Sequence, residues 1–144
     1  MPRATAILTQ LILTLVLVGC DGSDGPTKPR DEGVFLMRAC RGSEHAPQGE
    51  LFRALLRGPE LVAEAESRIV PGISPIYLNG QVLRGDGGFN APWSWHHDPA
   101  QTRFVEGVIE ACEGCPSFVE DDIDYWVDNL GHYCPFVEVL RRER

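Results

Sequence analysis

The chain has 144 residues, of which 13 are basic, 21 are acidic and 43% are hydrophobic. This length supports one hydrophobic core and is too short for two ordinary domains. The acidic balance excludes an electrostatic surface for nucleic acid, because phosphate contacts need clustered lysine and arginine.

The amino-terminal region predicts a bacterial lipoprotein signal peptide. Arg3 precedes an uncharged apolar run over residues 4–18, which is long enough for a signal peptide and too short for a membrane span. The run ends in Leu17-Val18-Gly19-Cys20, which resembles the bacterial lipobox. The resemblance implies removal of residues 1–19 and acylation of the Cys20 sulfur, for example with palmitate. An ordinary signal peptide that ends near a cysteine is the alternative.

A flexible linker is expected over residues 20–33. Residues 21–33 contain no aliphatic or aromatic side chain and cannot bury enough apolar surface to fold. Loss of the leader would leave 12 basic and 21 acidic residues, a net charge of −9, so the lipid would have to hold the protein on an anionic membrane. We expect one domain at residues 34–144, in the cell envelope and outside the cytoplasm.

The first half of this domain predicts two strands and a helix. Strands are expected at residues 34–41 and 51–56. A helix should begin at Gly58-Pro59 and end before Pro71, because proline is favoured in the first helical turn. Residues 76–84 carry Asn79-Gly80 in the middle, which indicates a tight hairpin turn or a bulge between short strands.

The second half predicts a hairpin, a helix and a final strand. Residues 92–98 and 103–112 are expected to pair around the turn at 99–102. A helix should begin at Pro116, with Ser117 and Glu120 spaced as a capping box, and should end at Gly131. A last strand follows at 134–140. These elements predict an α+β domain in which two helices pack on one face of a small antiparallel sheet.

Four cysteines follow Cys20, and an even number in an exported protein is typical of a disulfide framework. They are Cys40, Cys112, Cys115 and Cys134. Three pairings are possible. We favour Cys112 with Cys134 and Cys40 with Cys115, because this pairing ties the first segment and the last strand to the centre. The alternatives are a redox motif at Cys112-Glu-Gly-Cys115 and a zinc site that adds Cys134 and His132.

The densest run of chemically capable side chains is FNAPWSWHHDP, at residues 89–99. On a strand, Trp93, Trp95 and His97 would share one side, which we expect to face the core. A buried His97 would then need a hydrogen-bond partner. His96 and Asp98, on the other side, are the candidate ligand-binding pair, although Asp98 can instead bond to its own turn.

Several short motifs, in a fixed order over residues 51–140, resemble a known family. They include Phe89-Asn90, Pro92-Trp93-Ser94-Trp95-His96, Asp98-Pro99, Phe118-Val119-Glu120 and Tyr133-Cys134-Pro135. Together they resemble a domain first named from the amino-terminal part of an amoebal calmodulin-binding protein, of which small bacterial lipoproteins look like stand-alone copies. The resemblance implies a compact extracytoplasmic domain, with Cys112 and Cys134 as its characteristic cysteines and without assigned catalytic residues. It does not extend to calmodulin binding, which no basic motif here supports.

Three positions depart from the family pattern. His97 stands where the pattern usually has leucine, Phe136 stands where it usually has tryptophan, and Cys115 stands where no cysteine is required. The resemblance therefore implies that His97 replaces a packed aliphatic side chain.

We expect a lipid-anchored, disulfide-stabilised binding or interaction module without chemistry of its own. Its partners would be the membrane, through the lipid, and an unidentified protein or small molecule; no cofactor, metal or nucleic acid is expected. The enzymatic alternatives are a thiol oxidoreductase that uses Cys112 and Cys115, and a metal-dependent enzyme that uses His96 and Asp98.

Overall fold

The computed structural model describes residues 31–144, so the expected signal peptide, the lipidation site at Cys20 and most of the expected linker lie outside the described residues. Within this range, seven strands form one sheet in which all strand pairs are antiparallel. Among these residues, no helix has the length and apolar character needed to cross a bilayer. The sheet, the helices and two disulfide bonds confirm the predicted α+β class.

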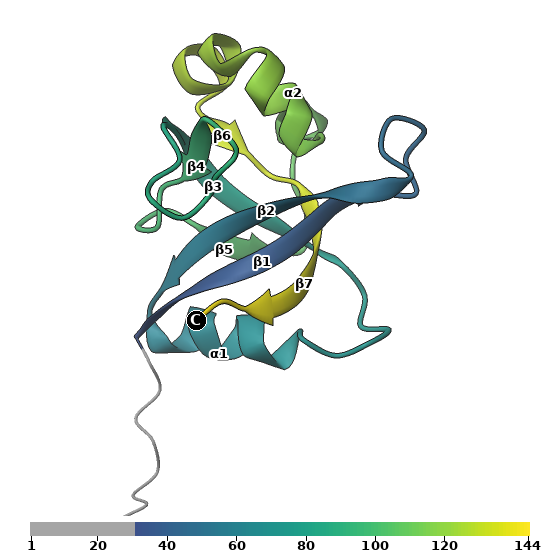
Figure 1. The fold of residues 1–144 in the computed structure, drawn as a ribbon, viewed down its shortest axis with the longest axis vertical. Coiled ribbons are helices and arrows are strands. Elements are labelled where there is room, and N and C mark those ends of the chain that lie inside the picture. The colour runs from purple at the N-terminus through teal and green to yellow at the C-terminus, as the bar shows by residue number, and fades with distance from the viewer. Residues whose placement is uncertain (1–30) are drawn as a thin grey trace, which may run out of the picture.

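A long hairpin of β1 (Glu32–Arg41) and β2 (Gln48–Arg57) forms one wall of the core. Met37 pairs with Phe52 and Phe35 with Ala54, so these four side chains share the buried face. Both strands were predicted from the sequence, but β1 begins two residues and β2 three residues before the expected start. The turn at residues 42–47 projects from the body of the molecule (Figure 1).

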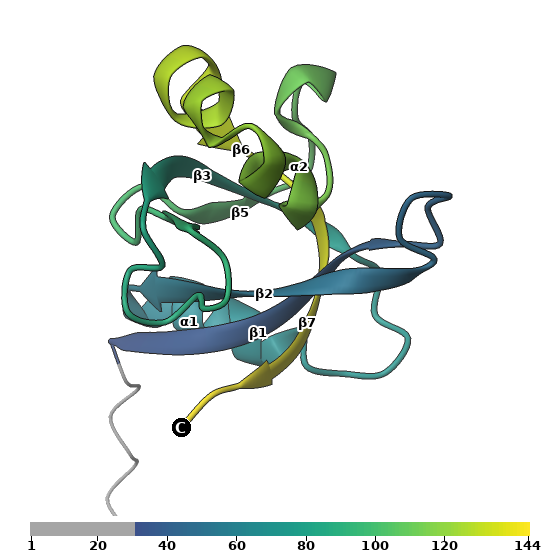
Figure 2. The ribbon, with the colours of Figure 1, turned by 45° about the horizontal axis from the view of Figure 1, so that its top comes forward.

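The sheet has the order β2-β1-β7-β3-β4, and β7 (Phe136–Arg142) joins its two halves. Figure 2 shows β1 and β2 in one layer, β3 in a second layer, and the bent β7 passing between them. Three short strands pair with β3 (Ile76–Arg84): β4 (Trp95–His97), β5 (Arg103–Val105) and β6 (His132–Tyr133). The core lies between the layers, where Phe52 packs 5.8 Å from the ring of Trp95.

Two hairpin predictions in this region are wrong. Asn79-Gly80 makes no turn, because β3 continues through it as one strand. Gly80 is needed for close packing, since a Cβ there would lie 2.7 Å from Cδ2 of His97 and 2.8 Å from Oγ1 of Thr102. The expected hairpin around residues 99–102 is also absent, because β4 and β5 each pair with β3 rather than with one another.

The helices lie at opposite ends of the long axis rather than together on one face (Figure 1). The first, α1 (Pro59–Ser67), buries Val62 and Ala65 against the core. The second, α2 (Pro116–Asp121), is short, and a π-helical segment, η2 (Tyr125–Leu130), continues it up to a left-handed Gly131. A 3-10 turn, η1 (Glu110–Cys112), precedes α2.

The predicted capping box at the start of α2 is wrong. Glu50 of β2 occupies the capping position, because its carboxylate accepts bonds from the backbone N–H of Ser117 at 2.7 Å and from the Ser117 hydroxyl at 2.8 Å. Glu120 instead accepts the backbone N–H of Ser94 at 2.8 Å. A distant strand therefore supplies the oxygen that the sequence pattern assigned to a local residue.

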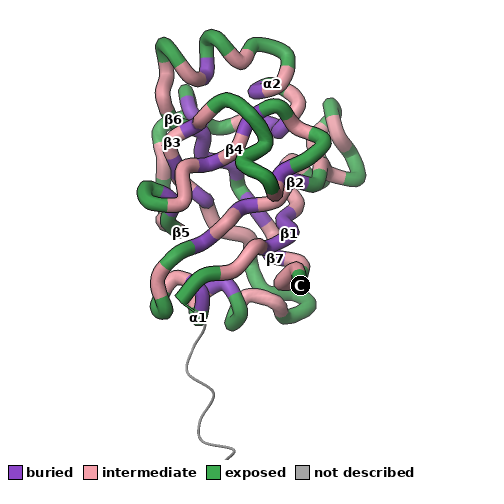
Figure 3. The backbone as a smooth tube through the Cα atoms, turned by 60° about the vertical axis from the view of Figure 1, so that its left-hand side comes forward, coloured by how far each residue is buried: buried purple, intermediate pink, exposed green. Residues whose placement is uncertain are grey.

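Burial follows the strands, and the connections between them are mostly exposed (Figure 3). The cysteines pair as favoured from the sequence, Cys40 with Cys115 and Cys112 with Cys134, with Cα atoms 5.5 and 5.3 Å apart. Because Cys112 and Cys115 lie in different bridges, the dipeptide between them, Glu113-Gly114, is attached to β1 on one side and to the start of β7 on the other.

Candidate functional site

The aromatic and histidine run that dominates the sequence is mainly part of the core. Trp95 and His97 are completely buried on one side of β4, and half-buried Trp93 lies 6.2 Å from the ring of Trp95. The indole N–H of Trp93 donates to the carbonyl oxygen of Leu51 at 2.8 Å, which fixes this residue against β2. The alternation therefore places these three side chains as predicted, with Trp93 at the edge of the core.

His97 is a core residue whose imidazole makes one hydrogen bond. Its Nε2 lies 3.0 Å from the carbonyl oxygen of Tyr133, so Nε2 carries the proton, and the two rings stack at 5.4 Å. Its Nδ1 has no partner among the residues described. Burial lowers the pKa of His97 to about 4, although the Tyr133 bond opposes this shift, and the side chain is therefore neutral near pH 7.

The candidate pair His96 and Asp98 forms no joint site, because each side chain bonds to its own turn. Nδ1 of His96 lies 2.7 Å from the carbonyl oxygen of Gly85. The Asp98 carboxylate accepts the backbone N–H of Ala100 at 2.9 Å and the side-chain amide of Gln101 at 3.0 Å. These two bonds lower the pKa of Asp98. Both residues are thus engaged in holding turns on either side of β4.

The structure also contradicts the two alternative roles of the cysteines, a redox pair and a zinc site. Neither Cys112 nor Cys115 is a free thiol, and they are not bonded to one another, so the spacing that suggested a redox pair serves two structural bridges. His132, the fourth candidate zinc ligand, lies with Nδ1 3.2 Å from the side-chain oxygen of Asn79. Over residues 31–144, no cluster of three or more histidine, cysteine or acidic side chains has the geometry for a metal ion.

A cleft lies elsewhere, beside the Cys40–Cys115 bridge. This cleft has a volume of about 580 Å³ and is formed by the end of β1, the Glu113-Gly114 dipeptide, and the first residues of β7. Its lining includes Arg38, residues 40–43, Pro75, residues 113–114, Phe136 and Glu138. A volume of this size is in the usual range for small-molecule sites.

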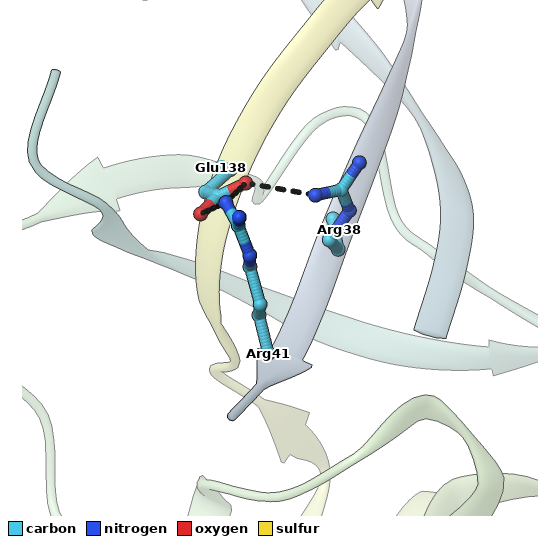
Figure 4. A network of polar contacts seen from close by, with 3 residues as sticks. All are labelled: Arg38, Arg41 and Glu138. Carbon is cyan, nitrogen blue, oxygen red and sulfur yellow. Dashed lines mark hydrogen bonds and ion pairs between the residues drawn. The ribbon is translucent and has the colours of Figure 1, made fainter. Parts of the chain in front are cut away.

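Three of the four charged side chains in the cleft lining form one cluster on β1 and β7. Arg38 and Glu138 are directly opposite one another on β1 and β7, and Nη1 of Arg38 lies 3.4 Å from Oε2 of Glu138. Arg41 follows at the end of β1, and its Nη1 lies 3.0 Å from Oε1 and 3.3 Å from Oε2 of the same carboxylate. Figure 4 shows both guanidinium groups converging on Glu138. This Arg38–Glu138–Arg41 triad places two positive charges against one negative charge.

An exposed aromatic ring lies next to the triad. Phe136 is 44% exposed, although it is a large apolar residue, and its ring packs at 4.8 Å on Tyr77 of β3. The Tyr77 hydroxyl donates to Glu113, a residue of the cleft lining, at 3.3 Å. Phe136 is part of the cleft lining, so its exposed ring offers apolar surface beside the triad.

The walls of the cleft are fixed by bonds to the core. Cys40, which lines the cleft, has a left-handed backbone with φ of 59°, which is uncommon for a residue other than glycine, and its bridge ties it to the buried Cys115. The carbonyl oxygen of Gly114 accepts the hydroxyl of buried Tyr133 at 3.0 Å. A smaller groove of about 420 Å³ continues from Arg41 and Glu138 along residues 69–73.

The cleft was not predicted from the sequence, because its parts are distant in the chain. Arg38 and Glu138 are 100 residues apart, and only the β1–β7 register brings them together. One signal was present: each residue is a charge in an otherwise apolar strand segment, FLMRAC and FVEVL. Charges at matching positions in two strands indicate a cross-strand pair, provided that the strands are known to be neighbours.

A family model for the BP-74 N-terminal domain matches residues 37–144. The match includes both disulfide bonds, the buried His97 and all three residues of the triad. No curated protein and no solved structure matches the chain.

Proposed function

The chain belongs to the BP-74 N-terminal domain family, and we propose that this member is a non-catalytic binding module, held outside the cytoplasm on a bacterial membrane by a lipid on Cys20. The observation that carries the binding function is the cleft beside the Cys40–Cys115 bridge, whose walls are covalently fixed. A preformed cleft avoids the free-energy cost of ordering the protein when a ligand binds.

The position of the cleft is consistent with a tethered receptor. β1 begins at Glu32, just after the expected linker, and ends at Arg41 in the cleft. Ten extended residues separate points roughly 30 Å apart. A lipid at Cys20 would therefore hold the start of β1 near the membrane and leave the cleft free to face away from it.

Bond assignments favour binding over the two enzymatic alternatives. A thiol oxidoreductase would need Cys112 and Cys115 as one reactive pair, whereas they belong to separate bridges. A metal-dependent enzyme would need His96 and Asp98 to converge, whereas they bond to different turns. A count of free thiols in the exported protein tests the first alternative, because two reactive thiols would support it and none would oppose it.

Site-directed photocrosslinking in intact cells tests binding at the cleft. A photoreactive residue replaces exposed Glu113 at the cleft, and a matched variant carries it at exposed Glu60 of α1, which is not part of the cleft lining. We expect a specific adduct, seen as a gain in mass, from position 113 and none from position 60. Equal labelling at both positions, or no labelling at 113, would overturn the assignment of the cleft.

Fractionation of cells tests the anchor. The wild-type protein should incorporate a labelled fatty acid and sediment with membranes, and Cys20→Ala should abolish both properties. A Cys20→Ala protein that stays with the membrane would show that another feature holds it there.

A further inference from the structure

The arginines of the cleft have unused hydrogen-bond donors. A guanidinium group has five N–H donors, yet Arg38 and Arg41 each reach Glu138 through Nη1 alone. Within residues 31–144, their Nε and Nη2 groups have no partner. The Arg41 side chain is 61% exposed and that of Arg38 is 28% exposed, so water or a ligand can reach these donors.

The charges of the cleft favour a ligand with one negative charge. The triad has a local net charge of +1, which one negative charge on a ligand would balance, and Glu113 elsewhere in the lining opposes any further negative charge. A planar carboxylate fits the donor geometry of arginine, as Glu138 itself demonstrates. A dianion such as phosphate could accept from the same donors. Its second negative charge, however, would be repelled by the carboxylates of Glu113 and Glu138.

The apolar part of the cleft indicates what the carboxylate is attached to. Phe136 presents an exposed ring beside the triad, and Pro75 and the Cys40–Cys115 bridge add further apolar surface. An aromatic ring on the ligand could pack against Phe136, which adds ring–ring attraction to the burial of apolar area.

Building on the proposed binding function, we propose that the cleft binds a carboxylate attached to an aromatic or aliphatic group, and that Glu138 competes with this carboxylate for Arg38 and Arg41. The carboxylate bonds to the guanidinium groups, and the apolar group packs on Phe136. Two sources have this chemistry: a free organic acid, and the carboxyl terminus of a peptide whose last side chain is apolar.

Titrations of the full chain in detergent, followed through the arginine Nε–H signals in NMR spectra, test the proposal. The probes are 3-phenylpropionate, acetyl-Ala-Phe with a free carboxyl terminus, acetyl-Ala-Phe amide, and inorganic phosphate. We expect one or both carboxylates to shift the Arg38 and Arg41 signals, with the tighter one identifying the source. The amide should not bind, and phosphate should bind more weakly than the carboxylates. Binding of the amide equal to that of the acid, or tighter binding of phosphate, would overturn the proposal.

Three variants separate recognition from structure. Arg41→Gln should weaken carboxylate binding on the order of tenfold, because one charge-assisted bond is lost. Glu138→Gln should tighten it several-fold, because the competing charge is removed while the shape is retained. Arg57→Gln, at an exposed ion pair with Glu32 outside the cleft, should leave binding unchanged. Weaker binding in Glu138→Gln would contradict the competition between carboxylates.

These results also separate the two proposals. Crosslinking at position 113 together with no response to either carboxylate would keep the binding module and remove this ligand class. An absence of both signals would remove the binding function as well.

Discussion

Two regions of the molecule combine ionisable side chains with aromatic rings: the core around His97 and the cleft around Glu138. In the core, His97 is completely buried, and its Nε2 is committed to the Tyr133 carbonyl. In the cleft, the side chains of Arg41 and Glu138 are 61% and 26% exposed, and the arginine has N–H donors without a hydrogen-bond partner among the described residues. The difference shows that accessibility and unused hydrogen bonds, rather than the density of reactive residue types, distinguish a candidate site from a packed core.

The largest loss of stability should come from removing a large side chain at the centre of the core. Trp95 is completely buried and packs 5.2 Å from the ring of Tyr133, so Trp95→Ala should lower the free energy of unfolding by roughly 3–5 kcal/mol. Chemical denaturation near pH 7 measures this loss. Trp93→Ala is the matched control, because Trp93 is only half-buried and should cost less. An equal or larger loss in the control would place the main packing outside the cluster around His97.

The second effect is a pH dependence of stability that comes from the buried His97. His97 has a pKa of about 4 in the folded protein against 6.5 when unperturbed, so acid protonates the unfolded chain first. Stability is therefore complete above pH 6.5 and falls as the pH drops toward 4, by about 3 kcal/mol for this group. His97→Leu should remove this contribution from the pH dependence of unfolding.

The comparison needs a control, because many carboxylates also titrate in acid. His45→Gln removes an exposed histidine outside the core and serves as the matched control. The quantity to compare is the change in unfolding free energy between pH 7 and pH 4 in each protein. Identical changes in wild type and His97→Leu would show that His97 is not held neutral by burial.

The third effect tests the close contact that supports His97. Gly80→Ala would place a methyl group 2.7 Å from the His97 ring, which is itself stacked on Tyr133 and cannot move freely. Overpacking of this kind should cost roughly 1–3 kcal/mol. Gly107→Ala, where a new Cβ would meet no atom within 4 Å, should be close to neutral in the same denaturation experiment. Equal stability of the two variants would show that β3 and β4 can separate at little cost.

Gly80 also illustrates how far the sequence could predict the fold. Local patterns predicted β1, β2, α1 and the final strand, because alternation, proline and glycine act over a few residues. They misread Asn79-Gly80 as a turn, since a glycine that admits a neighbouring strand looks the same as one that reverses the chain. The start of α2 was misread for a related reason, because Glu50 caps it from a distant strand.

The candidate site shows the same limit. The run from Trp93 to Asp98 drew attention because reactive residue types are adjacent in sequence, yet the strand sends alternate side chains to the core and to local turns. The triad could not be predicted from the lone charges in the two strand segments, because its geometry depends on the register of β1 with β7. Sequence alone predicted the cysteine pairs more successfully, since an even number in an exported chain restricts the choices to three.

The smallest effect on stability should come from the cleft itself, and it separates the two regions most sharply. Arg41→Gln removes one arm of an exposed ion pair, and such pairs contribute about 0–1 kcal/mol. We expect a loss below about 0.5 kcal/mol in chemical denaturation, similar to that of Arg57→Gln at the exposed pair with Glu32.

The same Arg41 variant should weaken carboxylate binding. A large loss of stability in Arg41→Gln, absent from Arg57→Gln, would make the triad a structural brace between β1 and β7. A small loss together with weaker binding would mean that these charges are retained for a ligand, because the fold does not need them.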